Sequence, residues 1–320
     1  MYLLELGGED DAFAVCEARR AATDLEGIAP GLAVARGVDE ERVRRLAYTH
    51  RASRLIGHGD ASLATARAIL EATRTDRSGS VRVRARRVRE TTGIDTQRVE
   101  RELGSILVDR GFSVDLEEPD HELRAVFSDD VCALGWLAVE SVRDFGARRP
   151  TRKPFFQPGS MDPLLARALA NVAGAGPGTT LLDPMCGTGG VLVEAGLAGS
   201  DVVGLDAQWK MVRGAHANLE RYLGDGFHVV RGDATALPVP DDAMDGVVFD
   251  APYGRQSRIE GELGSVVTGA LAEARRVAPR AVVVADRSWT EAAEGAGWSV
   301  EARFERRVHG SLTRHVLVLS

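Results

Sequence analysis

The stretch TLLDPMCGTGG, residues 180–190, decides how the C-terminal half of this chain folds. A short apolar segment ends at Asp183, and a glycine-rich turn follows it before a helix-like run. Glycine lets a backbone approach a ligand closely, and the first N–H groups of a helix are free to bind one. This order predicts a strand, a turn and a helix of a parallel α/β sheet, with a binding site at the carboxyl end of the strand.

The same order of strand, turn and helix continues along the C-terminal half. Asp162 and Pro163 open a preceding helix, which ends near Gly174. Apolar runs predict strands at residues 180–183, 202–206, 228–231, 246–250 and 281–286, and an antiparallel hairpin formed by 299–308 and 312–319. We therefore expect an α/β, Rossmann-like domain over 163–320, whose mostly parallel sheet ends in an antiparallel hairpin.

Two further aspartates follow predicted strands. Asp206 ends the strand after Asp183, where a carboxylate accepts hydrogen bonds from ribose hydroxyls. Asp233 follows the third strand, where it could accept a hydrogen bond from an adenine amine. Each aspartate could instead cap a helix. The turn lacks the Gly-Lys-Ser/Thr of a phosphate-binding loop, and Leu192 occupies the third-glycine position of dinucleotide sites, so both of those ligand classes are disfavoured.

The strongest motif is VVFDAPYG, residues 247–254, an apolar strand that ends in Asp-Ala-Pro-Tyr. The Asp250 carboxylate and the Ala251 carbonyl are two acceptors that could hold both N–H groups of an exocyclic amine. Tyr253 could stack on a base. The motif resembles the D/N-P-P-Y motif of S-adenosylmethionine-dependent amino-methyltransferases, with Ala251 where that family usually has proline. A backbone carbonyl does not depend on the side chain, so we expect the acceptor to survive.

The resemblance covers residues 155–320 and implies a class I methyltransferase domain with S-adenosylmethionine as cofactor. It also implies the roles of the site residues. The catalytic residues are Asp250, Ala251, Pro252 and Tyr253. The cofactor-binding residues are Asp183, Cys186, Gly187, Thr188, Gly189, Asp206, Ala207, Asp233 and Ala234. Cys186 is not expected to be a nucleophile, because cytosine-C5 methyltransferases lack an Asp-x-Pro-Tyr amine site. No metal ion is required, since the sulfonium supplies the activated methyl group.

The N-terminal half alternates short strand-like and helix-like segments. Helices are expected at 12–22, 39–51, 61–73 and 96–110, and strands at 2–6, 32–36, 80–89, 113–116 and 121–128. Residues 66–148 resemble a THUMP domain behind a ferredoxin-like unit at 1–65, an α+β arrangement that implies RNA binding. Residues 149–162 form a proline-rich segment that is expected to be a linker. The chain therefore divides into 1–65, 66–148, this linker and a catalytic domain at 163–320.

The charge of the chain is unevenly distributed. The net charge of −7 argues against a nucleic-acid partner, but residues 74–98 carry eight arginines against three acidic residues. A period-2 strand there places arginines on one face, where they could hold phosphates, although a solvated face is the alternative. The expected RNA contacts are Arg82, Arg84, Arg86, Arg87, Arg89, Arg255 and Arg314.

The segment FFQPGSMDPLLARALA, residues 155–170, narrows the family. It resembles the segment before the catalytic domain in archaeal THUMP-domain tRNA (guanine(10)-N2) methyltransferases, where it closes over the cofactor. Phe156 and Pro158 are therefore expected to wall the cofactor site, with ordinary linker packing as the alternative. The resemblance implies transfer of one or two methyl groups to N2 of a tRNA guanosine.

Other functions remain as alternatives at this point. They are an N2-guanine methyltransferase for another tRNA or rRNA position, and a non-catalytic RNA-binding protein of the same fold. An adenine-N6 DNA methyltransferase is disfavoured, because the N-terminal half does not resemble a DNA-recognition region. Three scattered cysteines, no leader-like N-terminus and no apolar run of membrane-spanning length predict a cytoplasmic protein, and we expect a monomer.

Overall fold

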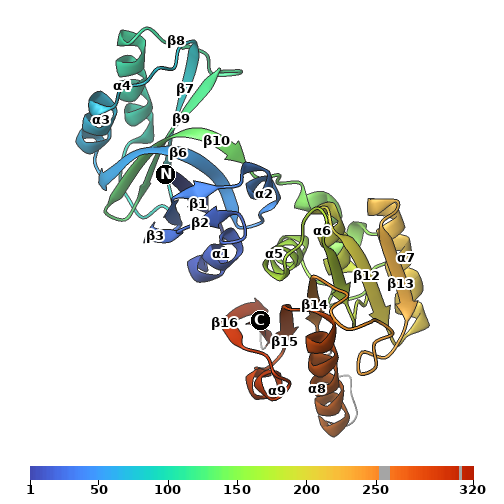
Figure 1. Cartoon of the computed structure of the whole chain (residues 1–320). Helices are drawn as coiled ribbons and strands as arrows, with labels where there is room; N and C mark the ends of the chain where they lie inside the picture. Colours follow the sequence, from blue (N-terminus) through green and yellow to red (C-terminus); the bar gives the residue numbers. More distant parts are fainter. Residues whose placement is uncertain (252–259, 310–311) are drawn as a thin grey trace. The chain divides into compact units, whose positions relative to one another are not determined.

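The computed structural model describes residues 1–251, 260–309 and 312–320 and divides them into two compact units, Met1–Val142 and Arg143–Ser320. Figure 1 shows the course of the chain through both units. In the first unit the elements are β1 (Tyr2–Leu6), α1 (Asp11–Ala18), β2 (Ala22–Thr23), β3 (Glu26–Ala29), β4 (Leu32–Ala35), β5 (Gly37–Val38), α2 (Glu40–Arg45), β6 (Thr49–Asp60), α3 (Leu63–Ala72), β7 (Ser80–Arg87), α4 (Thr96–Asp109), β8 (Ser113–Val114), β9 (His121–Ser128) and β10 (Val131–Glu140).

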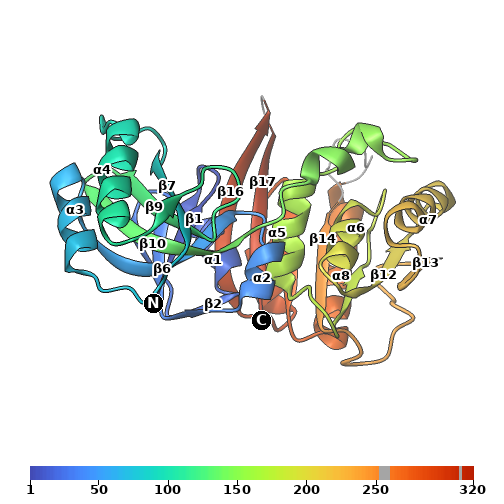
Figure 2. The ribbon, with the colours of Figure 1, turned by 90° about the horizontal axis from the view of Figure 1, so that it is seen from above.

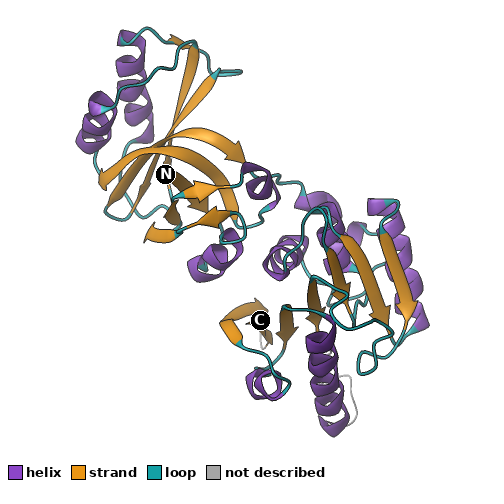
Figure 3. Ribbon diagram, in the orientation of Figure 1, coloured by secondary structure: helices purple, strands orange, loops and turns teal. Residues whose placement is uncertain are grey.

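One eight-stranded sheet runs through the first unit, in the order β3-β4-β1-β6-β10-β9-β7-β8. Helices α3 and α4 lie side by side on one face of this curved sheet (Figure 3), where Leu70, Val99 and Leu103 pack against Leu123 and other buried residues. The sheet joins strands from residues 1–60 with strands from residues 80–140, so the two segments share one continuous hydrogen-bonded sheet.

The expected helix at 39–51 is wrong in its second half. Asp39 caps α2 as expected, but the helix ends at Arg45 because Leu46 adopts an extended backbone. Residues from Thr49 onward belong to β6, which pairs with β1 on one side and β10 on the other. The hydrogen bonds to β1 and β10 stabilise the extended backbone more than the local sequence favours a helix. Strand β10 was also missing from the sequence-based expectation.

The second unit contains the predicted α/β domain. Its elements are η1 (Phe145–Arg148), η2 (Pro150–Arg152), α5 (Pro163–Ala173), β11 (Thr180–Asp183), α6 (Gly190–Leu197), β12 (Asp201–Asp206), α7 (Trp209–Leu223), β13 (Phe227–Arg231), β14 (Gly246–Asp250), α8 (Glu260–Val277), β15 (Ala281–Ala285), α9 (Thr290–Gly295), β16 (Val300–His309) and β17 (Leu312–Leu319). The strand order is β13-β12-β11-β14-β15-β17-β16, parallel as far as β15 and antiparallel beyond it, which confirms the expected fold class.

Helices cover both faces of this second sheet (Figure 2). Buried residues of α8 and α9, such as Val267, Leu271 and Ala293, pack with Leu182 and Phe249 of the central strands. Helices α5, α6 and α7 contact one another and the sheet on the other face. At its start α5 is capped by Asp162, which accepts the Leu164 N–H, and it ends at Gly174 in the left-handed conformation, as the sequence predicted. Both faces of the central strands are thereby buried, and the binding site is left at the strand ends.

Candidate active site

Four aspartates meet at one edge of the second sheet. Asp183, Asp206 and Asp250 are the last residues of β11, β12 and β14, and Asp233 follows β13 closely. These four strands are neighbours in the sheet and run parallel, so their carboxyl ends share one edge. The strand-end pattern of the sequence therefore predicted this grouping correctly.

Two pockets open at this edge. The larger, of about 660 Å³, is lined by Met185, Asp206, Ala207, Asp233, Ala234 and Asp250, among others. The smaller, of about 200 Å³, is lined by Pro158, Asp183, Cys186, Gly187, Thr188 and Asp250, among others. Met185 and Asp250 line both pockets, so Asp250 lies where the two meet.

The glycine-rich turn is held against the neighbouring strand β12. Gly187 and Gly189 have φ values of 53° and 72°, which favour glycine. The Gly187 N–H donates to Asp206 Oδ2 at 3.0 Å, and the Cys186 N–H donates to the Leu205 carbonyl at 2.8 Å. A Cβ at Gly189 would lie 3.2 Å from Ala215 Cβ of α7, so this glycine allows the turn to approach α7.

Asp183 is the most deeply buried carboxyl group of the site, at 3% exposed. Burial raises its pKa well above the usual value, and the nearby charges of Asp206 and Asp250 raise it further. The Met185 N–H donates to it at 3.0 Å, which opposes the shift. Asp183 and Asp250 line the smaller pocket, and Asp206 lines the larger one; these carboxyl groups favour a cationic ligand. The sulfonium and the α-ammonium of S-adenosylmethionine fit this requirement.

Neither Asp206 nor Asp233 caps a helix, so the capping alternative is wrong: the N-cap of α7 is Gln208, and the element after Asp233 is strand β14. Each aspartate instead accepts a hydrogen bond from the backbone N–H two residues ahead. Asp206 Oδ1 accepts the Gln208 N–H at 2.8 Å, just before α7 begins. Asp233 Oδ1 accepts both the N–H and the hydroxyl of Thr235, and these bonds lower the pKa of the carboxyl group. A carboxylate oxygen accepts more than one hydrogen bond, so both side chains keep acceptor capacity toward the larger pocket.

Burial also fixes the role of Cys186. Its side chain packs near Gly204 of β12, where a Cβ on that glycine would lie 3.2 Å from the sulfur. The pKa of the thiol is raised well above its usual value, mainly by burial and then by Asp183 and Asp206. A protonated thiol is a poor nucleophile, which agrees with a packing role in the turn.

The amine-binding motif is described as far as Ala251. Asp250 is partly exposed, with 24% of its side chain accessible, whereas Ala251 is buried and donates its N–H to Val284 of β15. Pro252, Tyr253 and Arg255 lie outside the described residues.

Arg314 differs from its expected place on an RNA-binding surface. It is 5% exposed on β17, and its guanidinium lies 3.3 Å from the Gly159 carbonyl and 3.5 Å from Asp250 Oδ2. The pairing of β17 with β15, the neighbour of β14, explains this position, because it turns Arg314 toward the strand end. Arg314 therefore connects the proline-rich segment to Asp250, and its burial argues against a contact with RNA.

The proline-rich segment lies against the glycine-rich turn. Buried Asn218 of α7 joins the two: its Oδ1 accepts the Phe155 N–H at 2.9 Å, and its Nδ2 donates to the carbonyls of Phe155 and Thr188. Ser160 Oγ also lies 3.3 Å from Thr188 Oγ1. Sequence reasoning missed Asn218, since nothing around an asparagine in a helix indicates a partner 63 residues away.

The structure places Phe156 and Pro158 differently from each other. Pro158 lines the smaller pocket, whereas Phe156 is 43% exposed and lines neither of the two pockets at the sheet edge. The preceding ring, Phe155, packs on α7, where it fills the space that a Cβ on Gly214 would need. The wall role of Phe156 remains a prediction.

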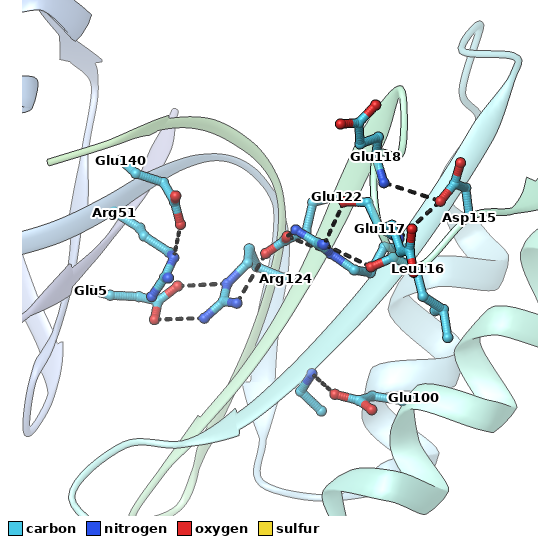
Figure 4. Close-up of polar contacts among 12 residues, drawn as sticks. Glu5, Arg51, Glu100, Asp115, Leu116, Glu117, Glu118, Glu122, Arg124 and Glu140 are labelled. Atoms are coloured by element: carbon cyan, nitrogen blue, oxygen red, sulfur yellow. Dashed lines mark hydrogen bonds and ion pairs between the residues drawn. The ribbon is translucent and has the colours of Figure 1, made fainter. Parts of the chain in front are cut away.

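The arginines of β7 are largely paired within the first unit. Arg82 donates to Glu122 Oε2 through Nε and Nη2, at 3.0 and 2.5 Å, because the parallel register places Arg82 opposite Glu122. Arg124 lies between Glu122 and Glu5 on the same face (Figure 4). Since Glu122 is only 9% exposed, Arg82 belongs to a buried ion network rather than to a free phosphate-binding face.

The other arginines of this row are more accessible. Arg86, Arg87 and Arg89 pair with Glu5, Glu90 and Asp11, and together they line a surface pocket of about 410 Å³. Arg84 makes no ion pair within the described part of the chain and lines another pocket. Exposed ion pairs contribute about 0–1 kcal/mol, so a phosphate can replace Glu90 or Asp11 at little cost. The partner of Arg86, Glu5, is buried, so this reasoning does not extend to that pair.

Within ranges 1–251, 260–309 and 312–320, no three His, Cys, Asp or Glu side chains form a group that could hold a metal ion. No helix in the same ranges is long and apolar enough to cross a membrane.

The fold and the site together define a Rossmann-like methyltransferase domain preceded by an RNA-binding unit. Residues 150–316 match the family model described as RMKL-like, methyltransferase domain, and residues 63–136 match the THUMP domain. The tRNA (guanine(10)-N2)-dimethyltransferase of Methanothermobacter thermautotrophicus is 39% identical over 290 residues, which cover 86% of this chain and 83% of the relative. The chain belongs to the tRNA (guanine(10)-N2)-dimethyltransferase family.

Two further comparisons agree with this assignment. The tRNA (guanine(10)-N2)-dimethyltransferase of Pyrococcus abyssi is 30% identical over 293 residues, covering 87% of this chain and 86% of the relative. The crystal structure of TrmN from Thermus thermophilus aligns with a TM-score of 0.52 at 24% identity, covering 99% of this chain and 98% of that one. The structural comparison supports the fold over the full chain.

Proposed function

We propose that this protein transfers methyl groups from S-adenosylmethionine to the exocyclic N2 of guanosine 10 in tRNA. The observation that carries the proposal is the position of Asp250, at the strand end where the two pockets meet. The similarity to relatives that bear this activity in their names supports the nucleotide, and the THUMP match supports the RNA substrate. The number of methyl groups transferred is one or two.

The chemistry requires a more reactive amine than guanine offers by itself. The N2 lone pair is delocalised into the purine ring, which makes N2 a weak nucleophile. The Asp250 carboxylate and the Ala251 carbonyl accept its two N–H groups and thereby favour the pyramidal nitrogen that attacks. Such fixed acceptors stabilise the transition state and orient the amine, while bound cofactor supplies the electrophilic methyl on its sulfonium.

The base must leave the RNA helix to reach Asp250, as in other enzymes that modify bases. In this proposal Tyr253 stacks on the extruded base, and Pro252 belongs to the same catalytic motif by resemblance. Base stacking on an aromatic ring contributes about 1–3 kcal/mol. Bound S-adenosylmethionine would supply the methyl group to N2 and leave as S-adenosylhomocysteine, and the proton that N2 releases would pass to water.

The cofactor residues divide between the two pockets. Asp206, Ala207, Asp233 and Ala234 bind the nucleoside in the larger pocket, where Asp206 accepts from ribose hydroxyls and Asp233 from the adenine amine. Asp183, Cys186, Gly187, Thr188 and Gly189 surround the methionine part, and Phe156 and Pro158 cover it. The carboxyl groups at the meeting point of the pockets support this orientation, since they favour the cationic end of the cofactor.

The RNA-binding surface in this proposal consists of the accessible arginines of the first unit, Arg84, Arg86, Arg87 and Arg89, together with Arg255. Arg82 and Arg314 leave the set, because Arg82 is only 24% exposed and held by buried Glu122, and Arg314 is itself buried beside Asp250. We retain the division into 1–65, 66–148, 149–162 and 163–320. In our proposal the protein acts in the cytoplasm as a monomer and needs no metal ion.

Nucleoside mass spectrometry with position mapping tests this function. tRNA from a strain that lacks the protein should lose N2-methylated guanosine at position 10, and the purified protein should restore it with S-adenosylmethionine. Loss of the modification at another position would favour the alternative of a different tRNA guanosine. Unmodified RNA after incubation, despite tight tRNA binding, would favour the non-catalytic RNA-binding alternative.

A further inference from the structure

Lys153 is a buried lysine beside the glycine-rich turn. It is 7% exposed, and it is one of only two lysines in a chain with 40 basic residues. Its ammonium lies 3.4 Å from the position that a Cβ on Gly190 would occupy, at the first turn of α6. Across the described residues, the structure gives its Nζ no hydrogen bond and no ion pair.

Glu194, the carboxylate whose charge acts most strongly on Lys153, is already paired with two arginines. Glu194, which is fully buried, accepts from Arg148 Nε at 2.7 Å and lies 2.9 Å from Arg167 Nη2. Lys153 is therefore a third buried cation beside a carboxylate that two guanidinium groups share. Burial lowers the pKa of Lys153 and the charge of Arg148 lowers it further, against the opposing charges of Glu194 and Asp162.

The location makes an additional positive charge costly. The first turn of a helix carries the positive end of the helix dipole, which disfavours a cation there and favours an anion. Gly190, beside which the Lys153 ammonium lies, lines the smaller pocket together with Thr188. An anion at this end of the pocket would receive hydrogen bonds from the ammonium and from backbone N–H groups of the helix.

The opposite charge is present elsewhere on the wall of the same pocket. Asp183 and Asp250 line it, and they favour a cationic group. A pocket with carboxyl groups on its wall and a buried ammonium beside Gly190, one of its lining residues, is complementary to an α-amino acid, which carries both charges on adjacent groups. The methionine part of S-adenosylmethionine is such an amino acid.

We propose that the Lys153 ammonium binds the α-carboxylate of the cofactor's methionine part. Lys153 is then a cofactor-binding residue supplied by the segment before the catalytic domain. The proposal rests on the proposed use of S-adenosylmethionine, but it does not depend on which RNA or which guanosine is methylated.

Calorimetric titration of the full-length protein tests the contact through both partners. S-adenosyl-3-thiopropylamine is S-adenosylhomocysteine without its carboxylate. Lys153→Met removes the ammonium and keeps a side chain of similar length. We expect this variant to bind S-adenosylhomocysteine about tenfold to hundredfold more weakly, because a hydrogen bond between charged groups is lost. Its affinity for the thiopropylamine should change less than about twofold, because this ligand has no carboxylate for Lys153 to bind.

The matched control is Lys210→Met, which removes the other lysine of the chain, an exposed one on α7. It should leave both affinities unchanged. Equal losses for the two ligands in Lys153→Met, or no loss for either, would overturn the proposal. If Lys153→Met does not fold, the affinities of the unmutated protein for the two ligands are compared instead. Equal affinity for S-adenosylhomocysteine and the thiopropylamine would also overturn the proposal. Failure to bind either ligand would instead contradict the use of the cofactor.

Discussion

Asp250 is the residue whose replacement separates catalysis from binding. It ends β14, where the two pockets meet, and it accepts an N–H of the target amine in the proposed mechanism. Asp250→Ala should lower methyl transfer by at least about 10²–10³-fold, the effect typical of losing one fixed polar contact to a transition state. Transfer is measured with labelled cofactor and a tRNA transcript.

Binding measurements supply the control for Asp250→Ala. Affinity for tRNA should stay within about twofold, because the phosphate-binding arginines are unchanged. If the variant methylates tRNA at the rate of the unmutated protein, Asp250 has no part in the reaction.

Asp183 is a buried carboxyl group whose ionisation lowers the stability of the folded protein. Its pKa is raised by burial, so the folded protein holds this proton more tightly than the unfolded chain does. The stability due to this group is therefore greatest below pH of about 4 and falls as the pH rises toward the folded pKa. Asp183→Asn should remove that fall and raise the Tm of the ligand-free protein at pH 7, because a buried amide stays neutral without binding a proton.

The same substitution should weaken cofactor binding, because an amide cannot neutralise a cation. Thermal melts at pH 5 and pH 7, with and without S-adenosylhomocysteine, measure both effects. The explanation fails if Asp183→Asn melts at or below the temperature of the unmutated protein at pH 7 without ligand.

At the scale of elements, strand β7 carries two kinds of arginine with different expected effects. Arg87 on β7 and Arg89 just after it form ion pairs with the more exposed Glu90 and Asp11, and Arg86 is itself accessible although its partner Glu5 is buried. Arg82 is less accessible than Arg86 and Arg87 and is held by buried Glu122. Replacing the three accessible arginines by alanine should weaken tRNA binding and reduce the slope of log K against log salt by roughly 2–3. The change in slope is measured by filter binding at salt concentrations from about 50 to about 200 mM, over which such phosphate contacts change the affinity strongly.

Two controls accompany this experiment. Arg36, Arg42 and Arg44 are also exposed and paired with nearby acidic residues, but they do not belong to the proposed RNA-binding surface. Their replacement should therefore leave the slope unchanged. Arg82→Ala should instead lower the free energy of unfolding by about 1–3 kcal/mol, because it leaves Glu122 without one partner. An unchanged slope in the first triple variant would show that the β7 arginines do not contact RNA.

At the scale of the whole molecule, each compact unit has its own hydrophobic core. Residues Arg143–Ser320 include both pockets, the proline-rich segment and Lys153. A protein consisting of residues 143–320 should therefore fold and bind S-adenosylhomocysteine within about threefold of the full chain, since every proposed cofactor contact is retained.

The same fragment should bind tRNA at least tenfold more weakly, because it lacks all the arginines of β7 and their phosphate contacts. Calorimetry and filter binding measure the two affinities side by side. If the fragment binds tRNA as tightly as the full chain, the RNA-binding role of the first unit is contradicted.

The sequence by itself determined the α/β domain and the place of its site. Strands that end in aspartate, the glycine-rich turn and the capped helix at Asp162 are local patterns, and neighbouring parallel strands bring their carboxyl ends together without further information. The Asp-Ala-Pro-Tyr motif predicts the amine-binding end by resemblance to known methyltransferases.

The tertiary structure decided the features that depend on partners distant in sequence. Strand β6 replaced the end of an expected helix because two neighbouring strands offered ladders to it. Arg82 and Arg314 turned inward because the strand pairing placed Glu122 and Asp250 within reach. Lys153 reached the glycine-rich turn because its segment folds back onto α6 and α7. Local sequence shows that a side chain is charged, but the partner of that charge depends on long-range packing.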